Sequence, residues 1–415
     1  MANVYRELFR APGTVAFSAA GFVARMTMPM TGIGIITMLG LLRGDYALAG
    51  AVSAAFTLST ALCGPRVSRW VDRAGQHRVL WPAAGLSLLA LGALLLCARY
   101  EAPVWSLFVC AVLAGALPNM AAMVRARWTH LHQGSPRLHT AYAWESVVDE
   151  LTFVIGPALA VALSTVLFPE AGPLAAAVLL ALGVAWFVPQ KATEPPVVRA
   201  GTHALAGAGR SAVRNPSVRL LASVLVAGGA IVGTVDVVSV AFAEERGTPA
   251  GAGIVLSAYA VGSALAGLAF GARTPRLPLP LLLVIGAAGT ACTTLPLLWV
   301  DGLPGLAALV FVSGLFFAPT MIVVMGLVER SVPAPQLTEG MTWAITGLSV
   351  GVALGAAVSG HLVDRFGPAS GFVVAVVAGA LALLLSLAAR GPLTRTPAGG
   401  LEPVAAGAPT ADGRG

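Results

Sequence analysis

The sequence predicts an all-α integral membrane protein with twelve transmembrane helices in two six-helix, pseudo-symmetric halves. Of its 415 residues, 57% are apolar and 10% are charged, whereas soluble domains carry about 25% charged residues. The apolar residues gather into twelve runs, each close to or above the roughly 20 residues that a helix needs to cross a bilayer. The second six runs also repeat part of the first six, and this repeat divides the chain into halves.

The charges between the runs set the expected topology. If each run crosses once, the segments on one side hold 20 Lys and Arg residues and those on the other side hold 4. Because cationic loops stay in the cytosol, both termini are expected there, and the protein is expected in the cytoplasmic cell membrane. The runs cover residues 14–42, 47–65, 79–98, 103–124, 140–166, 173–189, 217–241, 250–272, 277–300, 304–327, 338–362 and 370–389.

Two polar segments divide the rest of the chain. Residues 190–216 are rich in Pro, Gly and charge, which is typical of a linker, here a cytosolic one. This linker separates an N-terminal bundle, residues 1–189, from a C-terminal bundle, residues 217–390. Residues 391–415 have the composition of a disordered cytosolic tail.

The internal repeat appears when the second half is shifted by 203 residues. Gly50 then falls on Gly253, Gly64 on Gly267 and Arg73 on Arg276. Apolar matches arise easily by chance, but two glycines and an arginine in one register do not. Parallel halves around a site near the membrane midplane are a known transporter plan.

The fifth run carries three carboxylates inside an apolar helix. A rise of about 1.5 Å per residue places Asp149 and Glu150 about 13–15 Å deep, with Glu145 nearer the cytosolic surface. A charge at that depth costs several kcal/mol unless it is protonated, paired or facing water. Asp149 shares one helix stripe with Glu145, and Glu150 points about 100° away. Such a stripe predicts a buried polar pathway.

Arg25 lies at the same depth in the first run, so we expect it to pair with a helix 5 carboxylate, most directly Asp149. Either the pair is static, or one acid is the counter-ion while Glu150 or Glu145 carries a proton. Asp236 is the deep acid of the second half. Asn119, after Pro118, is expected as a cavity donor or a helix–helix hydrogen bond. The fourth run, 103–124, contains no arginine, and Arg125 is expected in the cytosolic segment that follows it. The basic residues of that segment are expected to form a solvated loop: Arg127, His130, His132 and His139.

The segment after the second run reads SRWVDRAGQHR, from Ser68 to Arg78. Gly75 allows a tight turn, the aspartate can cap a helix, and the arginines can pair across helices. With Asp72, Arg73, Gly75 and Arg78 at these spacings, the segment resembles the loop signature of the major facilitator superfamily. That signature has Gly at the position of Ser68. The resemblance implies a twelve-helix transporter whose loop latches one state; the alternative is a plain turn with topology-setting arginines.

A second resemblance lies in helix 5, where Gly156-Pro157 is similar to the end of the antiporter motif of drug/proton exchangers. It implies proton-coupled export. A proline in a membrane helix also forms a plain kink, so the same dipeptide fits a structural role.

These observations favour a secondary transporter over an enzyme. The chain has no phosphate-binding P-loop or HExxH motif, and its four cysteines show no CxxC spacing, so no cofactor or metal is expected. The expected activity is proton-coupled export of a small hydrophobic or amphipathic compound by a monomer in the lipid bilayer. No nucleic-acid partner is expected, since the positive charge follows the membrane topology. The alternatives are uptake or facilitation of a metabolite and, from another class, a non-transporting receptor or a membrane-embedded enzyme.

The topology gives the first testable prediction. A cysteine introduced at Thr202, in the expected linker, should not react with a membrane-impermeant maleimide added to intact cells, and it should react after the cells are opened. Labelling from outside intact cells would contradict cytosolic placement of the linker.

Overall fold

The structure is a computed structural model that describes residues 2–197, 211–248, 250–273 and 276–395. Residues 198–210 of the expected linker and 396–415 of the expected tail lie outside the described residues. Every regular element described is a helix, which confirms the all-α fold class.

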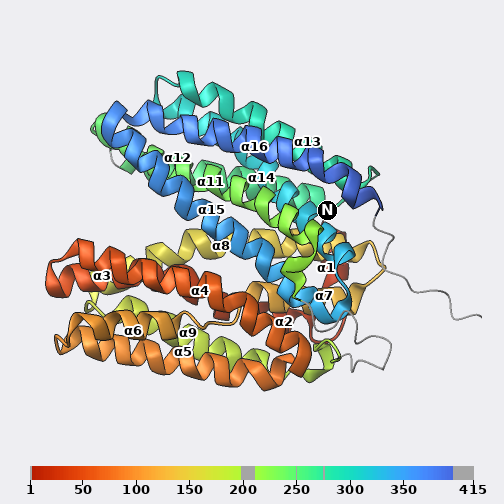
Figure 1. Cartoon of the computed structure of the whole chain (residues 1–415), viewed down its shortest axis with the longest axis horizontal. Coiled ribbons are helices and arrows are strands. Elements are labelled where there is room, and N and C mark those ends of the chain that lie inside the picture. The colour runs from red at the N-terminus through yellow and green to blue at the C-terminus, as the bar shows by residue number, and fades with distance from the viewer. Residues whose placement is uncertain (1, 198–210, 249, 274–275, 396–415) are drawn as a thin grey trace, which may run out of the picture.

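Twelve apolar passes build the fold (Figure 1). In the described residues, ten helical spans are long and apolar enough to cross a membrane, and the shorter helices α6 and α9 belong to the other two passes. The first half contains α1 (Ala2–Leu8), α2 (Thr14–Arg25), α3 (Thr27–Arg43), α4 (Tyr46–Ala74), α5 (Gln76–Arg99), α6 (Val104–Ala114), α7 (Met120–His132), α8 (Arg137–Val166), α9 (Ala171–Phe187) and η1 (Lys191–Thr193). The second half contains η2 (Ala212–Arg214), α11 (Pro216–Glu245), α12 (Ala250–Gly271), α13 (Leu279–Thr294), η3 (Leu295–Trp299), α14 (Leu303–Ser331), η4 (Ala334–Gln336), α15 (Leu337–Phe366) and α16 (Pro368–Arg395).

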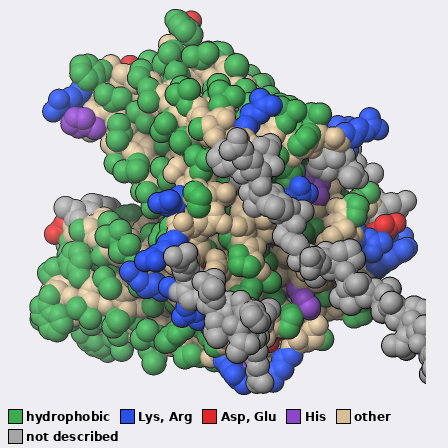
Figure 2. Space-filling model, turned by 45° about the vertical axis from the view of Figure 1, so that its right-hand side comes forward, with side chains coloured by type: hydrophobic (Ala, Val, Ile, Leu, Met, Phe, Trp, Pro, Cys, Tyr) green, Lys and Arg blue, Asp and Glu red, His purple; other side chains and the backbone are tan. Residues whose placement is uncertain are grey.

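The two halves meet at one end of the molecule and diverge toward the other (Figure 1). We call the end that carries α1, η1 and η2 the terminus side, and the opposite end the far side. Between the halves, α4 packs on α15, and α8 packs on α12 and α14. On the face that Figure 2 shows, apolar side chains are spread over both lobes, as a lipid-facing surface requires.

Backbone contact between α11 and α15 holds the second half together. Three glycines of α15 lie one turn apart, so they form a smooth stripe against α11. A Cβ atom at any of them would overlap a backbone carbonyl oxygen of α11, so no larger residue fits. The glycines are Gly347, Gly351 and Gly355, and the carbonyls belong to Ala222, Val226 and Ala230. Small residues give the same close approach between membrane helices in general.

The structure corrects the expected end of helix 4. The run 103–124 is interrupted after Ala114, and the helix resumes as α7, which reaches His132. Arg125 and Arg127 therefore lie inside a helix and are fully buried, not in a solvated loop. The prediction failed because polarity was taken to mark the membrane surface, whereas Arg125 pairs with a carboxylate and Arg127 is enclosed by acceptors of the same half.

Three further boundaries differ from the expected ones. The segment Ser68–Arg78 is not a loop: α4 continues to Ala74 and α5 starts at Gln76. Gly75 alone breaks the helix, with φ +92°, a conformation that side chains other than glycine rarely adopt. The first pass is divided after Arg25, since Pro29 has no N–H to donate to the Arg25 carbonyl. The last helix extends to Arg395, so the expected tail begins inside it.

Candidate functional site

A cavity of about 760 Å³ lies between the two halves. Its walls are mainly apolar, and they include the aromatic rings of Phe153, Tyr259 and Phe317. Five polar side chains predicted from the sequence line it together, from both halves: Arg25, Asn119, Asp149, Glu150 and Asp236. The cavity therefore joins the candidate residues at the level where the halves separate, and Figure 2 shows a notch between the two lobes.

Hydrogen bonds close the cavity on the terminus side. Besides those of Asp72, several hydrogen bonds between described residues cross between the halves there. They join the Tyr5 hydroxyl to the Leu268 carbonyl (2.8 Å), Ser68 to Thr342 (2.8 Å), Thr140 to the Gly271 carbonyl (2.7 Å) and His139 Nε2 to the Phe270 carbonyl (3.0 Å). Among the described residues, no hydrogen bond or ion pair joins the halves on the far side, so the cavity opens toward that side.

Asp72 forms the central bond of this closure. It lies in the last turn of α4, and its carboxylate accepts hydrogen bonds from the backbone N–H groups of Thr338 (3.2 Å) and Glu339 (2.9 Å). These groups belong to the first turn of α15, where no intrahelical acceptor is available and the helix dipole favours an anion. Asp72 of one half thus caps a helix of the other half. Arg73 and Arg78 are exposed on the terminus side.

Both ends of the segment between the halves touch this closure. Glu194 accepts a hydrogen bond from the backbone N–H of His77 (3.0 Å), two residues after Gly75. Ser211, from the other end, donates to Glu339, and Arg69 lies 3.8 Å from the same carboxylate. Movement of either half about the closure must therefore displace the connecting segment.

A compact charge cluster lies beside the cavity. Arg25 contacts Glu145 (2.5 Å) and Asp149 (2.8 Å), so the expected pair with Asp149 is present and is shared with a second acid. Arg125 contacts the other oxygen of Asp149 (2.5 Å). Trp128 donates to Glu145 (2.8 Å). Two arginines and two carboxylates balance each other here, which is what lets four ionised groups exist inside a membrane bundle.

The two acids of the cluster differ in access. Glu145 is fully buried, and its two oxygens are taken by Arg25 and Trp128. The Asp149 side chain is 23% exposed and lines the cavity. Asp149 is thus the member of the cluster that water or a ligand can reach from the far side.

Glu150 and Asp236 stand apart from the cluster. Glu150 accepts a hydrogen bond from Ser263 of α12 (2.8 Å), so it joins the two halves at the cavity. Asp236 of α11 is exposed to the cavity. Within the described residues, neither carboxylate has a cationic side chain at ion-pair distance. These are the groups whose charge depends most on protons or ligands in the cavity.

The remaining candidates have mainly structural contacts. Asn119 is the N-cap of α7: its side-chain oxygen accepts from the Ala122 N–H (3.0 Å), and it also lines the cavity. Gly156 lies against Pro29 of α3 so closely that a Cβ would come within 2.9 Å of the proline ring. Pro157 lines the cavity within an uninterrupted α8.

The Major Facilitator Superfamily profile matches residues 15–246 and 234–411, which together span nearly the whole chain. The chain belongs to the major facilitator superfamily. It is therefore a multi-pass membrane transporter and not an enzyme. No curated protein matches the sequence significantly.

Solved superfamily structures share the fold at low identity. The human organic anion transporter MFSD10 (TETRAN) is 14% identical, with a TM-score of 0.69, over 92% of this chain and 100% of that chain. A bacterial homologue of the iron transporter ferroportin, in an outward-facing state, is 14% identical, with a TM-score of 0.68, over the same shares of the two chains. The same homologue with soaked iron gives a TM-score of 0.66 at 14% identity, over 92% and 99%. At this identity the likeness shows the fold alone.

Sequence reasoning missed Arg125, which completes the cluster in this superfamily member. One signal could have found it. Gly115, Pro118 and Asn119 interrupt the run 103–124, and the 11 residues of α6 span only about 16 Å. Because a pass needs about 30 Å, the helix has to resume after Asn119 and continue beyond Arg125.

The contacts of the charge cluster predict an order of stability among variants of Asp149 and its two arginine partners. Asp149→Asn should lower the free energy of unfolding by about 3 kcal/mol, since it leaves Arg125 as an unpaired buried charge. Arg125→Met in the same chain should restore most of that loss. Arg25→Met should restore less, because Arg25 keeps Glu145 as its partner. Thermal unfolding of the purified variants in detergent measures the order, and equal rescue by both substitutions would contradict it.

The closure predicts a shift between conformations. Asp72→Ala removes two hydrogen bonds to a charged group, each worth about 1.5 kcal/mol or more, so the terminus side should open in a population at least tenfold larger. Spin labels on cysteines at Lys191 and Arg330, one on each half and both exposed, should show this as a longer distance. The four native cysteines are first replaced by serine.

Arg66→Ala is the matched control for Asp72→Ala, because Arg66 is an exposed charge on the same helix and, within the described part of the chain, donates to the Leu62 carbonyl of that helix. An unchanged distance distribution in Asp72→Ala, or an equal change in Arg66→Ala, would show that Asp72 does not hold the closure.

Proposed function

We propose that this chain is a proton-coupled exporter of a small hydrophobic or amphipathic compound, working by alternating access as a monomer in the cytoplasmic cell membrane. With the terminus side in the cytosol, the structure is an outward-facing state. The observation that carries the proposal is a mainly apolar cavity, open on one side and latched on the other, with two carboxylates that have no cationic partner among the described residues.

The charge of the cavity indicates the coupling ion. Arg25 and Arg125 are neutralised by Glu145 and Asp149, so Glu150 and Asp236 add negative charge that no described residue balances. A carboxylate enclosed by apolar walls is stable when it is protonated or faces a cation. Protons from the far side satisfy both acids while the cavity is empty.

The sequence analysis left Glu145 and Glu150 as alternative proton carriers, and Glu150 is the better placed of the two. Glu145 is held by two donors and is fully buried, so a proton reaches it only if the cluster breaks. Glu150 lines the cavity, and its hydrogen-bond partner among the described residues, Ser263, belongs to the other half. Protonation of Glu150 therefore acts directly on a contact between the moving halves.

The same charges favour particular cargo. An anionic compound would meet an excess of negative charge, whereas a neutral or cationic amphipathic compound can use the apolar walls and the faces of Tyr259 and Phe317. In the proposed cycle the cargo leaves to the outside as Glu150 takes a proton. The bonds of Asp72 then break, the terminus side opens, the proton enters the cytosol and the next cargo molecule binds.

Reconstitution tests the proposal. Proteoliposomes are loaded in turn with tetraphenylphosphonium (a lipophilic cation), chloramphenicol (neutral) and benzoate (an anion), and a pH gradient is imposed. We expect the cation or the neutral compound to move against the direction of proton flow. Glu150→Gln should reduce this gradient-driven movement at least tenfold and keep exchange of the compound across the membrane. Glu245→Gln, an exposed acid at the end of α11, is the control.

Movement in the same direction as the protons would identify uptake and overturn export. Full gradient-driven movement in Glu150→Gln, Asp236→Asn and the double variant would overturn the coupling assignment.

A further inference from the structure

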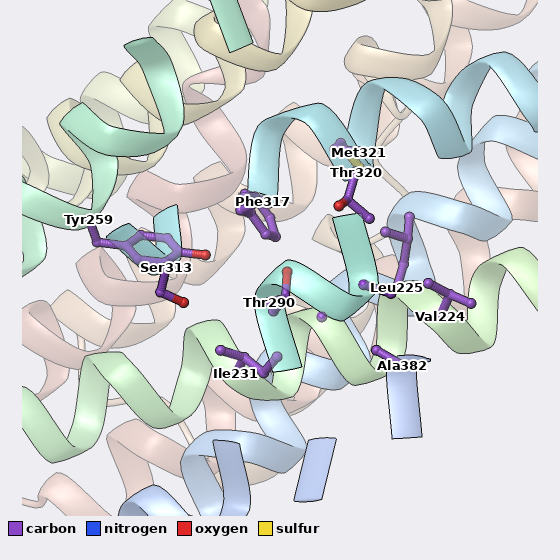
Figure 3. A pocket seen from close by; sticks show the side chains of 12 residues that line it. Val224, Leu225, Ile231, Tyr259, Thr290, Ser313, Phe317, Thr320, Met321 and Ala382 are labelled. Carbon is purple, nitrogen blue, oxygen red and sulfur yellow. The ribbon is translucent and has the colours of Figure 1, made fainter. Parts of the chain in front are cut away.

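A second, smaller cavity of about 30 Å³ lies inside the second half, behind Tyr259 (Figure 3). It is enclosed by α11, α12, α13, α14 and α16. Its walls are apolar except for four hydroxyl groups, those of Tyr259, Thr290, Ser313 and Thr320. Since one water needs about 10–15 Å³ of such space, the cavity has room for two.

The hydroxyl groups have unused hydrogen-bonding capacity. Thr290 donates to the Gly286 carbonyl (3.0 Å) and Thr320 to the Phe316 carbonyl (2.7 Å), so both can still accept a bond. Tyr259 and Ser313 are buried, at 7% and 2% exposure, and their hydroxyls have no hydrogen-bond partner within the described residues. A buried hydroxyl without a partner is unfavourable, and ordered water satisfies such groups. The hydroxyls of Tyr259 and Ser313 can donate hydrogen bonds and those of Thr290 and Thr320 can accept them, so two water molecules would find partners here.

This cavity adjoins the main one. Tyr259, Phe317 and Met321 line both, so a single layer of side chains separates them. Ser263, the partner of Glu150, lies one helical turn after Tyr259 on α12. From Tyr259 the small cavity continues past Ser313 to Thr320, and α14 runs in that direction toward the terminus side.

We propose that the small cavity is a hydration site that holds two waters and receives the proton of Glu150 inside the second half, from where the proton is released when the terminus side opens. This proton relay rests on the proposed function, because it takes Glu150 as the proton carrier. The O–H bond of protonated Glu150 breaks and a water of the main cavity takes the proton. The Tyr259 hydroxyl accepts that proton on its oxygen and releases its own to the buried waters. Tyr259 ends neutral, Glu150 is a carboxylate, and the water pair carries one extra proton.

Hydration is tested without transport. X-ray radiolysis in ¹⁸O water labels side chains next to ordered water, and mass spectrometry locates the label. Leu225 and Ile231 line only the small cavity and are almost fully buried, so they should be labelled several-fold more than Leu283, which is buried outside it. Labelling no higher than that of Leu283 would overturn the hydration site.

The matched variants are Thr290→Val and Thr293→Val, two threonines of α13 of which only Thr290 lines the cavity. Thr290→Val, alone or with Ser313→Val, should lower the labelling of Leu225 and Ile231 to the level of Leu283, and Thr293→Val should not. Thr320→Val replaces the double variant if that variant does not fold.

Transport measurements test the proton relay separately from the hydration of the cavity. With whichever of the three compounds the wild type moves fastest, Thr290→Val should reduce gradient-driven movement about tenfold and leave exchange intact. Lower labelling with unchanged gradient-driven movement would overturn the relay. No gradient-driven movement in the wild type would overturn the proposed function and the relay with it, while the labelling result would still decide whether the cavity is hydrated.

Discussion

The pairing of Arg25 and Arg125 with Asp149 is the interaction on which the site depends. One carboxylate holds two buried guanidinium groups, one from the first pass and one from the fourth, against a helix of the fifth. Because an unpaired charge in a bundle core costs several kcal/mol, the three passes cannot separate without losing this pair. The cluster therefore makes the first half a rigid wall of the cavity, and Glu145 with Trp128 fixes the direction of Arg25.

The contacts between the halves are of another kind. They consist mostly of single hydrogen bonds to helix ends and carbonyls, such as those of Asp72 and Thr140. A neutral bond of this kind contributes about 1 kcal/mol and a bond to the Asp72 carboxylate about 1.5 kcal/mol or more, and water can replace each when the halves part. A first half held by paired charges and a second half held by close helix packing, joined by replaceable bonds, can move as two rigid bodies about a central site. The described ends of the connecting segment are tied to the halves, since Glu194 contacts His77 and Ser211 contacts Glu339.

Much of the fold could be predicted from the sequence, because the length of each hydrophobic run shows where a helix crosses the membrane. The twelve passes and the depth match of Arg25 with Asp149 follow from counting residues along a helix. Arg125 did not follow, since a buried arginine and a surface arginine look alike until the partner carboxylate is placed. The extent of α4 was missed for the same reason: Asp72 is polar, but its partners are backbone groups of α15 that no local pattern reveals.

Two neighbouring residues of α8, Asp149 and Glu150, have different roles because their side chains point in different directions. Asp149 and Glu150 are neighbours in the chain, yet about 100° of helical rotation separates their side chains. Asp149 turns toward two arginines of its own half, and Glu150 turns toward Ser263 of the other half. Among the described residues, one acid is thus paired with two cations, and the other has a hydroxyl group as its hydrogen-bond partner. In the proposed proton-coupled cycle, the second acid gains more from protonation, so the change of charge falls at the contact between the halves and leaves the charge cluster of the first half intact.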